Sequence, residues 1–215
     1  IGFNRGVAVA ADRVFQVTDN AHLIALNRFN GELLWETEMA DWHQNYNGTS
    51  APLVVGNLVI SGLAGGDEGA RGFVGAYDQT TGKEVWRFWT VPKPGEPGSE
   101  TWKGKNTEHR SGATWMTGTY DESTGLIYWP VGNPGPDYDG ADRLGDNLYT
   151  DCVIALDAKT GKELWVVKLN ASVMANPATY QGKDGRQYVS VVATGGTLGG
   201  APLTSDEVVA FRIKK

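Results

Sequence analysis

The stretch VIALDAKTGKELW, residues 153–165, has the pattern of two short β-strands joined by a tight turn. Its first residues are strand formers, and residues 157–161 have turn chemistry. The glycine that ends this turn can adopt a positive φ without steric cost. The apolar run resumes at Leu164 and Trp165. The stretch therefore predicts a β-hairpin that ends on a tryptophan.

The same hairpin pattern occurs twice earlier, as FVGAYDQTTGKEVW and LIALNRFNGELLW. In each copy the tryptophan lies eight positions after the first turn residue. The glycine lies midway, four positions after that residue and four before the tryptophan. The aligned positions are Asn27, Gly31 and Trp35; Asp78, Gly82 and Trp86; and Asp157, Gly161 and Trp165. Three copies in one register indicate a repeat protein rather than a chance pattern.

Around these hairpins the sequence divides into four units of short strand candidates, without helical periodicity of useful length. Such units predict an all-β fold, a β-propeller built of four four-stranded antiparallel blades in a single domain over residues 1–215. The last unit shows only three strand candidates. The repeated tryptophans are expected to be structural residues buried between neighbouring sheets. The predicted blades cover roughly residues 6–38, 51–91, 113–168 and 172–213.

The composition limits the class of function. The 215 residues include 29 Gly and 8 Trp, which suits short strands, many turns and large buried rings. A net charge of −6 without a basic run argues against nucleic acid as a partner. The one cysteine, Cys152, excludes an internal disulfide and is expected to be a small buried residue. We expect no membrane-spanning run and no signal peptide in this chain.

Three long insertions interrupt the strand pattern, at residues 39–50, 92–112 and 133–150. The second is rich in proline, glycine and polar residues and is expected to run over the surface. Long loops between regular strands tend to carry binding and catalytic residues. We therefore expect function to reside in these loops.

Four segments carry a resemblance to a known family. They are Asn4-Arg5-Gly6, residues 65–92 (GGDEGARGFVGAYDQTTGKEVWRFWTVP), residues 112–140 (GATWMTGTYDESTGLIYWPVGNPGPDYDG) and residues 145–161 (GDNLYTDCVIALDAKTG). The chain resembles the dehydrogenases for alcohols, methanol and glucose that depend on pyrroloquinoline quinone (PQQ). Residues 1–168 resemble the first three blades of that family's eight-bladed ring, and residues 172–213 resemble its last blade. The fold would then be half of an eight-bladed ring.

The resemblance implies PQQ in the central channel, with a calcium or lanthanide ion beside it. PQQ is a flat tricarboxylate, so a guanidinium suits its carboxylates and an indole suits its face. A hard cation needs oxygen ligands. By position, the cofactor contacts would be Arg5, Thr49, Gly65, Gly66 and Trp115, and the cation ligands would be Asn133 with Asp67 or the adjacent Glu68.

Structural interpretations of the same residues stay open at this point. The Asp67-Glu68 pair has the composition of an exposed turn, and Asn133 before Pro134 that of a turn residue. Trp115 alone would more often belong to a core. For the acidic loop of Asp137, Asp139, Asp142 and Asp146, calcium binding is one alternative, but the spacing lacks an EF-hand pattern, which favours a solvated loop.

Two functions are weighed. The first is an enzyme that oxidises an alcohol or aldose by hydride transfer to PQQ. The resemblance implies that such an enzyme is periplasmic and passes its electrons to a cytochrome or a membrane quinone. The family's catalytic aspartate lies in its middle blades, which have no counterpart here, so no catalytic residue is assigned. The alternative is a catalytically inactive, shortened propeller that binds PQQ or a protein partner. The sequence does not indicate the substrate.

The blade pattern also bears on assembly. Four blades with the curvature of an eight-bladed ring leave a bare sheet face at each end. A tighter four-bladed ring or a two-fold homodimer would cover these faces. The homodimer is favoured because it keeps the curvature of the family, and residues 1–6 would then lie beside the partner's fourth blade.

Overall fold

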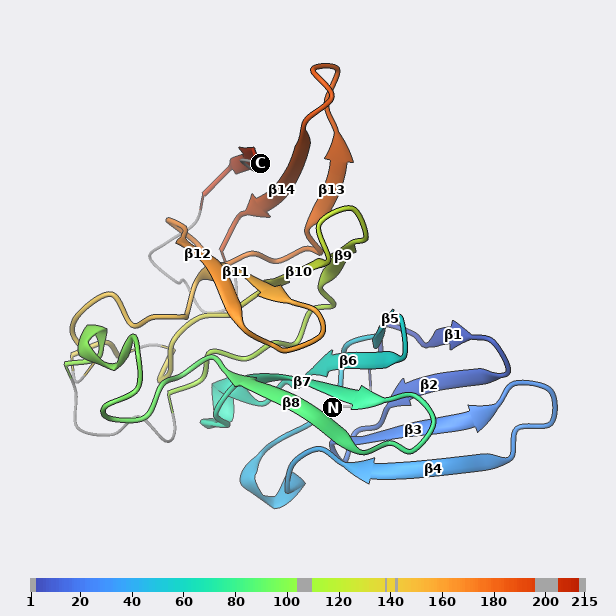
Figure 1. The fold of residues 1–215 in the computed structure, drawn as a ribbon. Helices are drawn as coiled ribbons and strands as arrows, with labels where there is room; N and C mark the ends of the chain where they lie inside the picture. The colour runs from blue at the N-terminus through green and yellow to red at the C-terminus, as the bar shows by residue number, and fades with distance from the viewer. Residues whose placement is uncertain (1–2, 104–109, 138, 142, 196–204, 213–215) are drawn as a thin grey trace.

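The computed structural model describes residues 3–103, 110–137, 139–141, 143–195 and 205–212. Strands within these residues form four antiparallel sheets, each built from consecutive strands. In the described part of the chain, the first three sheets have four strands and the fourth has three. The all-β prediction is confirmed, and the architecture is that of a partial β-propeller (Figure 1).

The four sheets contain the following strands. The first sheet has β1 (Ala8–Ala10), β2 (Arg13–Val17), β3 (His22–Asn27) and β4 (Leu33–Glu38). The second has β5 (Leu53–Val55), β6 (Leu58–Gly62), β7 (Phe73–Asp78) and β8 (Glu84–Trp89). The third has β9 (Thr119–Asp121), β10 (Leu126–Pro130), β11 (Cys152–Asp157) and β12 (Glu163–Lys168). The fourth has β13 (Ala178–Gln181), β14 (Gln187–Ala193) and β15 (Glu207–Arg212).

Helix in the described residues is confined to three short 3₁₀ segments in loops. These are η1 (Trp42–Gln44), η2 (Gly66–Glu68) and η3 (Ser99–Thr101). No helix in this part of the chain is long and apolar enough to cross a membrane.

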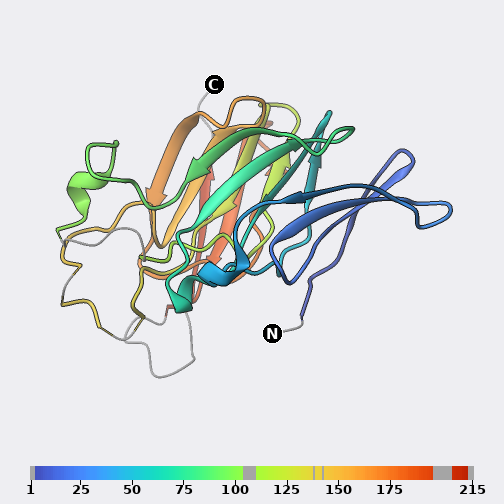
Figure 2. The same ribbon diagram turned by 90° about the horizontal axis from the view of Figure 1, so that it is seen from below.

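The sheets follow one another in an arc whose inner side is formed by the first strand of each sheet. β1 contacts β5, β5 contacts β9, and β9 contacts β13. The fourth strands β4, β8 and β12 lie toward the outside. Figure 1 shows the arc with the first and fourth sheets at its ends, and Figure 2 shows the same structure from below.

Each pair of neighbouring sheets encloses its own apolar cluster. Phe15 and Tyr77 are buried between the first and second sheets. Ile60 and Trp129 are buried between the second and third, and Val191 lies in the cluster between the third and fourth. The second and third sheets therefore bury both faces, which explains the nearly continuous apolar pattern of their middle strands.

The repeated tryptophan of one sheet packs on the repeated glycine of the next. The Trp35 Nε1 group donates a hydrogen bond to the main-chain oxygen of Gln79 at 2.9 Å. A Cβ added to Gly82 would stand 2.6 Å from the Trp35 ring. Gly82 also has a φ of +70°. Glycine is therefore needed twice at this position, for the turn and for the approach of the indole.

Trp86 makes the same contacts one sheet further along. Its Nε1 group donates to the main-chain oxygen of Ala158 at 3.2 Å, and a Cβ on Gly161 would stand 2.5 Å from its ring. Trp86 is buried, as expected from the sequence. Trp35 and Trp165 are only half-buried, because each lies on the rim of its cluster.

Cys152 lies fully buried in β11, and burial raises the pKa of its thiol to about 12. Only the thiolate reacts quickly with disulfide reagents. We therefore expect no reaction of native protein with an aromatic disulfide reagent at mildly alkaline pH, and reaction of one thiol per chain in denaturant. Rapid modification without denaturant would contradict this packing.

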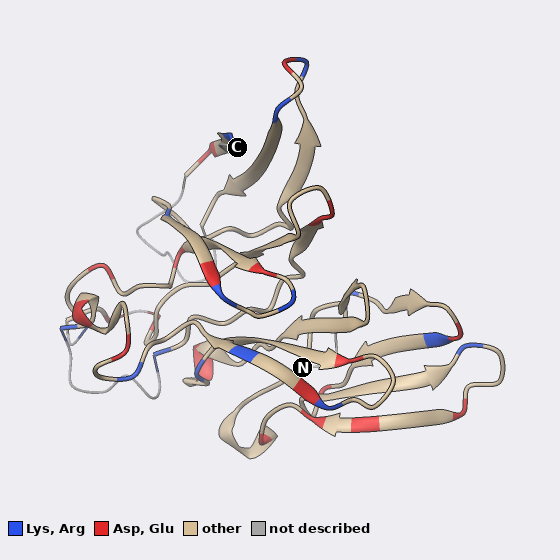
Figure 3. Ribbon diagram, viewed as in Figure 1, with Lys and Arg blue, Asp and Glu red and all other residues tan. Residues whose placement is uncertain are grey.

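Strand direction decides which loops share a face. In a sheet of consecutive antiparallel strands, the chain reverses direction at each strand. The start of the first strand, the end of the second, the start of the third and the end of the fourth therefore lie at the same end of the sheet. The described residues of five groups of segments therefore lie on one face of the arc, called here the site face: 3–7, 39–52, 63–72, 90–103 with 110–118, and 131–137 with 139–141 and 143–151. Figure 3 shows that charged residues gather mainly in loops and on the outer strands.

Candidate functional site

All eight predicted site residues lie on the site face. Arg5 precedes β1, and Thr49 lies between β4 and β5. The loop from β6 to β7 carries Gly65, Gly66, Asp67 and Glu68, Trp115 precedes β9, and Asn133 follows β10. The topology thus brings segments from three sheets to one region. No strand carries a predicted site residue, so their relative positions depend on loop paths.

Three of the predicted cofactor residues contact one another. The Arg5 guanidinium lies over the Trp115 ring, 4.7 Å from its centroid. Its Nη1 donates to the main-chain oxygen of Thr49 at 3.2 Å, and the Thr49 hydroxyl donates to the main-chain oxygen of Trp115 at 3.3 Å. Thr49 is buried, whereas Arg5 is exposed. The three residues therefore present a cation, a flat ring and a hydroxyl at one place.

Asp67 and Asn133 meet through a residue that the sequence did not single out as a ligand. The Asn133 Nδ2 group donates to Asp137 Oδ1 at 2.6 Å. Burial, followed by the charge of Asp67 and a hydrogen bond with it, raises the pKa of Asp137 to about 6. Two carboxylates and an amide thus share one small region, and their oxygens are the ligands that hard cations prefer.

The expectation that the acidic loop is solvated holds for only part of it. Asp137 is half-buried and lies against Asn133 and Asp67, so it belongs to the candidate site. Asp139 is exposed and accepts a hydrogen bond from the main-chain nitrogen of Ala141 at 2.9 Å, as in a turn. Asp146 is also exposed, and Asp142 lies outside the described residues.

The surroundings of Asp67 and Glu68 differ. Both side chains are exposed, but Asp67 interacts with Asp137. The main-chain oxygen of Glu68 accepts a hydrogen bond from Asn45 Nδ2 at 2.9 Å. Asp67 is therefore the better candidate for a cation ligand.

Glycines join the two groups of residues. A Cβ on Gly66 would stand 2.2 Å from Ser111 Oγ, and one on Gly132 would stand 3.4 Å from Trp115 Nε1. Gly65 has a φ of +105°, and a Cβ there would meet the main-chain oxygen of Asn45 at 1.9 Å. These close approaches hold the loop with Asp67 against the segment that leads to Trp115. Gly65 and Gly66 therefore shape the site through the backbone.

The donor set suits a hard cation with a polycarboxylate beside it. In the described residues no group of three or more His, Cys, Asp and Glu side chains is arranged to hold a metal. Two carboxylates and one amide oxygen leave coordination positions for ligand oxygens. Arg5 over Trp115 supplies a positive charge and an aromatic face next to this set. The residues present thus fit a flat anionic group held together with a metal ion.

Comparison with known proteins agrees with this chemistry. A family model described as "PQQ: Glucose/ethanol/alcohol dehydrogenase, beta-propeller domain" matches residues 4–167 and 157–189. The quinohemoprotein alcohol dehydrogenase ADH IIB of Pseudomonas putida is 38% identical over 178 residues, which cover 75% of this chain and 25% of that protein. The lanthanide-dependent methanol dehydrogenase of Methylacidiphilum fumariolicum is 34% identical, with coverage of 77% and 30%.

A solved structure of the same kind superposes on most of the chain. The quinohemoprotein alcohol dehydrogenase ADHIIG from Pseudomonas putida HK5 gives a TM-score of 0.80 at 30% identity and covers 98% of this chain and 34% of its own. The chain therefore spans between a quarter and about a third of the relatives named here. The family model matches well over half of the chain. The chain belongs to the β-propeller family of PQQ-dependent glucose, ethanol and alcohol dehydrogenases.

Proposed function

We propose that the site face binds PQQ together with a calcium or lanthanide ion, and that the protein is a quinoprotein dehydrogenase for an alcohol or an aldose. The observation that carries this proposal is the convergence of Arg5, Thr49 and Trp115 beside Asp67, Asn133 and Asp137. One group suits a flat polycarboxylate, and the other suits a hard cation.

Each residue has a distinct part in holding the cofactor. Trp115 supports the flat face of the ring system, Arg5 pairs with a carboxylate, and Thr49 offers a hydroxyl. Asp67, Asn133 and Asp137 contribute oxygen ligands to the cation. When bound, PQQ supplies a quinone carbonyl that accepts hydride from the substrate, and the cation polarises that carbonyl. No catalytic base is assigned to a residue of this chain.

Reconstitution separates the enzyme from the scaffold. The purified protein would be loaded with PQQ and either calcium or lanthanum, freed of unbound cofactor, and tested for reduction of an artificial dye. We expect reduction that requires an alcohol or an aldose. Retention of PQQ without substrate-dependent reduction would instead support the inactive scaffold. Failure to retain PQQ would contradict the proposed enzyme and leave, of the two alternatives, only a propeller that binds a protein partner.

Trp115→Ala should weaken PQQ binding by at least about tenfold, because it removes the aromatic face beneath the cofactor. The measurement is a PQQ titration followed by absorbance. Trp35→Ala serves as a matched control, since Trp35 is half-buried like Trp115 and bonds to Gln79 in the turn between β7 and β8, on the face opposite the site. Equal losses from the two substitutions would show that the effect arises from general destabilisation, and would contradict the assignment of Trp115.

We also propose a homodimer, a cytochrome or membrane quinone as electron acceptor, and a periplasmic location. The homodimer rests on apolar residues exposed on the outer faces of the end sheets, where Val9 of β1 is 55% and Val208 of β15 is 72% exposed. Light scattering at micromolar concentration should give twice the mass of the chain. In Val208→Lys the measured mass should fall to that of a single chain. A monomer mass for the unmodified protein would contradict the dimer.

A further inference from the structure

The segment of residues 113–118 carries Trp115 across the site face to the start of β9. These residues lie outside the strands, so the hydrogen bonds of a sheet do not fix the place of the indole ring. The ring nevertheless has a defined neighbour, because the Arg5 guanidinium lies 4.7 Å from its centroid. The residue before it, Thr114, makes bonds that give this segment its position.

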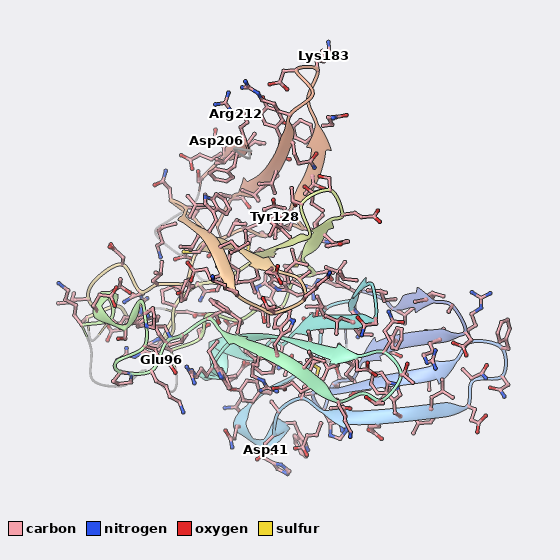
Figure 4. The ribbon with its side chains drawn as sticks, in the orientation of Figure 1. Asp41, Glu96, Tyr128, Lys183, Asp206 and Arg212 are labelled. Carbon is pink, nitrogen blue, oxygen red and sulfur yellow. The ribbon has the colours of Figure 1, made fainter. Side chains whose placement is uncertain are left out.

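Thr114 bonds to the second sheet through its main chain and through its hydroxyl. Its main-chain nitrogen donates to the main-chain oxygen of Leu63 at 3.0 Å, and the Leu63 nitrogen donates to the Thr114 hydroxyl at 3.1 Å. The hydroxyl in turn donates to the main-chain oxygen of Phe73, the first residue of β7. Thr114 is fully buried, and side chains fill the spaces between the sheets (Figure 4). The hydroxyl thus has a donor and an acceptor partner in the second sheet and ties the Trp115 segment to it.

The second sheet leaves space for this threonine. Gly62 ends β6, and a Cβ added to it would overlap the Thr114 hydroxyl and the Thr114 main-chain oxygen. The φ of Gly62 is not positive, so the turn geometry does not require a glycine there. The close approach of Thr114 is the reason for this glycine, and it brings the Trp115 segment directly against β6.

Two other threonines bond to the same segment. The Thr49 hydroxyl donates to the main-chain oxygen of Trp115 at 3.3 Å, and the Thr117 hydroxyl donates to the main-chain oxygen of Ala51 at 2.8 Å. Thr49 is itself a proposed cofactor contact, and Thr117 is only half-buried. Thr114 differs from both because it is fully buried and faces the second sheet. An effect of Thr114 on a ligand must therefore pass through Trp115.

We propose that Thr114 is a positioning residue for the PQQ site: its hydroxyl fixes the Trp115 ring relative to the second sheet and does not itself touch the cofactor. This inference rests on the proposed function. Without the hydroxyl, the Leu63 N–H and the Phe73 carbonyl would each lose a buried partner, and the segment would move to restore these bonds. A displaced ring would stack less well on a flat cofactor and would change its contact with Arg5.

Three variants test the proposal. Thr114→Val keeps the shape of threonine without its hydrogen bonds, and Thr114→Ser keeps the hydroxyl. Thr37→Val is the control, since it removes a hydroxyl that donates to the main-chain oxygen of Gly82 at 2.7 Å, in a turn on the opposite face. One readout is the affinity for PQQ in the presence of calcium, from an absorbance titration. The other is the indole N–H resonance of Trp115 in cofactor-free protein, identified by its loss in Trp115→Phe.

We expect Thr114→Val to shift the Trp115 resonance and to weaken PQQ binding roughly tenfold, the size of effect seen for groups that orient a metal ligand. Thr114→Ser and Thr37→Val should leave the resonance and the affinity close to those of the unmodified protein. If Thr114→Val does not fold, Thr114→Cys takes its place, because a thiol is a weaker hydrogen-bonding group than a hydroxyl and should produce the same changes at smaller size.

An unchanged PQQ affinity in Thr114→Val would overturn the proposal, whether or not the Trp115 resonance shifts. Equal losses of affinity in Thr114→Ser would assign the effect to the methyl group and overturn the role of the hydroxyl. Equal losses in Thr37→Val would assign the effect to general destabilisation and overturn it as well.

The inference and the proposed function fail separately. If the unmodified protein retains no PQQ, the proposed function fails, but the resonance in cofactor-free protein still decides whether Thr114 positions Trp115. A shift in Thr114→Val that is absent from Thr114→Ser would support the positioning role, and an unshifted resonance in Thr114→Val would overturn it.

Discussion

Gly161→Ala should lower the free energy of unfolding by roughly 2–5 kcal/mol, as the sum of strain and overpacking. The φ of Gly161 is +68°, and a Cβ there would stand 2.5 Å from Trp86. Trp86 is bonded to Ala158 at 3.2 Å, so its ring cannot move away without loss of that hydrogen bond. The substitution therefore separates the second and third sheets or strains the turn.

Gly31→Ala is the matched control for this prediction. Gly31 occupies the same turn position in the first sheet with a φ of +75°, but no atom lies within 4 Å of its ideal Cβ. Only the conformational cost of about 1–2 kcal/mol should remain. Urea denaturation followed by circular dichroism measures both variants. Equal destabilisation by the two would contradict the contact between tryptophan and glycine as the reason for the repeat.

Asp67→Asn should weaken binding of calcium or lanthanum by more than roughly ten- to a hundredfold, since even substitution of groups that only orient a ligand has effects of that size. The amide keeps the shape of the carboxylate but removes the charge that the cation needs. Titration calorimetry without PQQ measures the cation alone, so the result does not depend on cofactor binding.

Glu68→Gln is the control for Asp67→Asn, because this substitution of the neighbouring residue removes one negative charge from the same 3₁₀ segment. We expect little change, since Glu68 contacts the site loops through its main-chain oxygen. A large loss from Glu68→Gln with full binding in Asp67→Asn would reverse the assignment.

The fold could be predicted from the sequence because its main determinant is local and repeated. The turn glycine four residues before a tryptophan has a positive φ in all three hairpins, and Gly82 and Gly161 also pack on the tryptophan of the preceding sheet. The bounds of the first strand in a sheet were less predictable. β9 covers only Thr119–Asp121, whereas the sequence pattern favoured a start at Ala113, because residues 113–118 leave the sheet to form part of the site face. The half-burial of Trp165 depends on what the fourth sheet places against it.

The site was predictable only in part, for a related reason. Arg5, Thr49 and Trp115 were indicated by family motifs, and they lie in mutual contact. Asp137 follows Asn133 by four residues in a loop without periodicity, so no pattern told which of the loop carboxylates turns inward. Its role depends on the path of residues 133–137, which is set by contacts with a distant segment, such as the approach of Gly135 to Ser111. Loops positioned by long-range contacts are the part of a fold that local sequence describes least.

The most direct test of the proposed site is the dependence of PQQ binding on the cation. The affinity of the unmodified protein for PQQ would be measured with calcium or lanthanum and with a chelator, alongside Asp67→Asn. We predict saturable binding of one PQQ per chain, tighter with the cation, and loss of this coupling in the variant. The absence of saturable binding, or an affinity that is the same with cation and with chelator, would contradict a joint site for cofactor and metal.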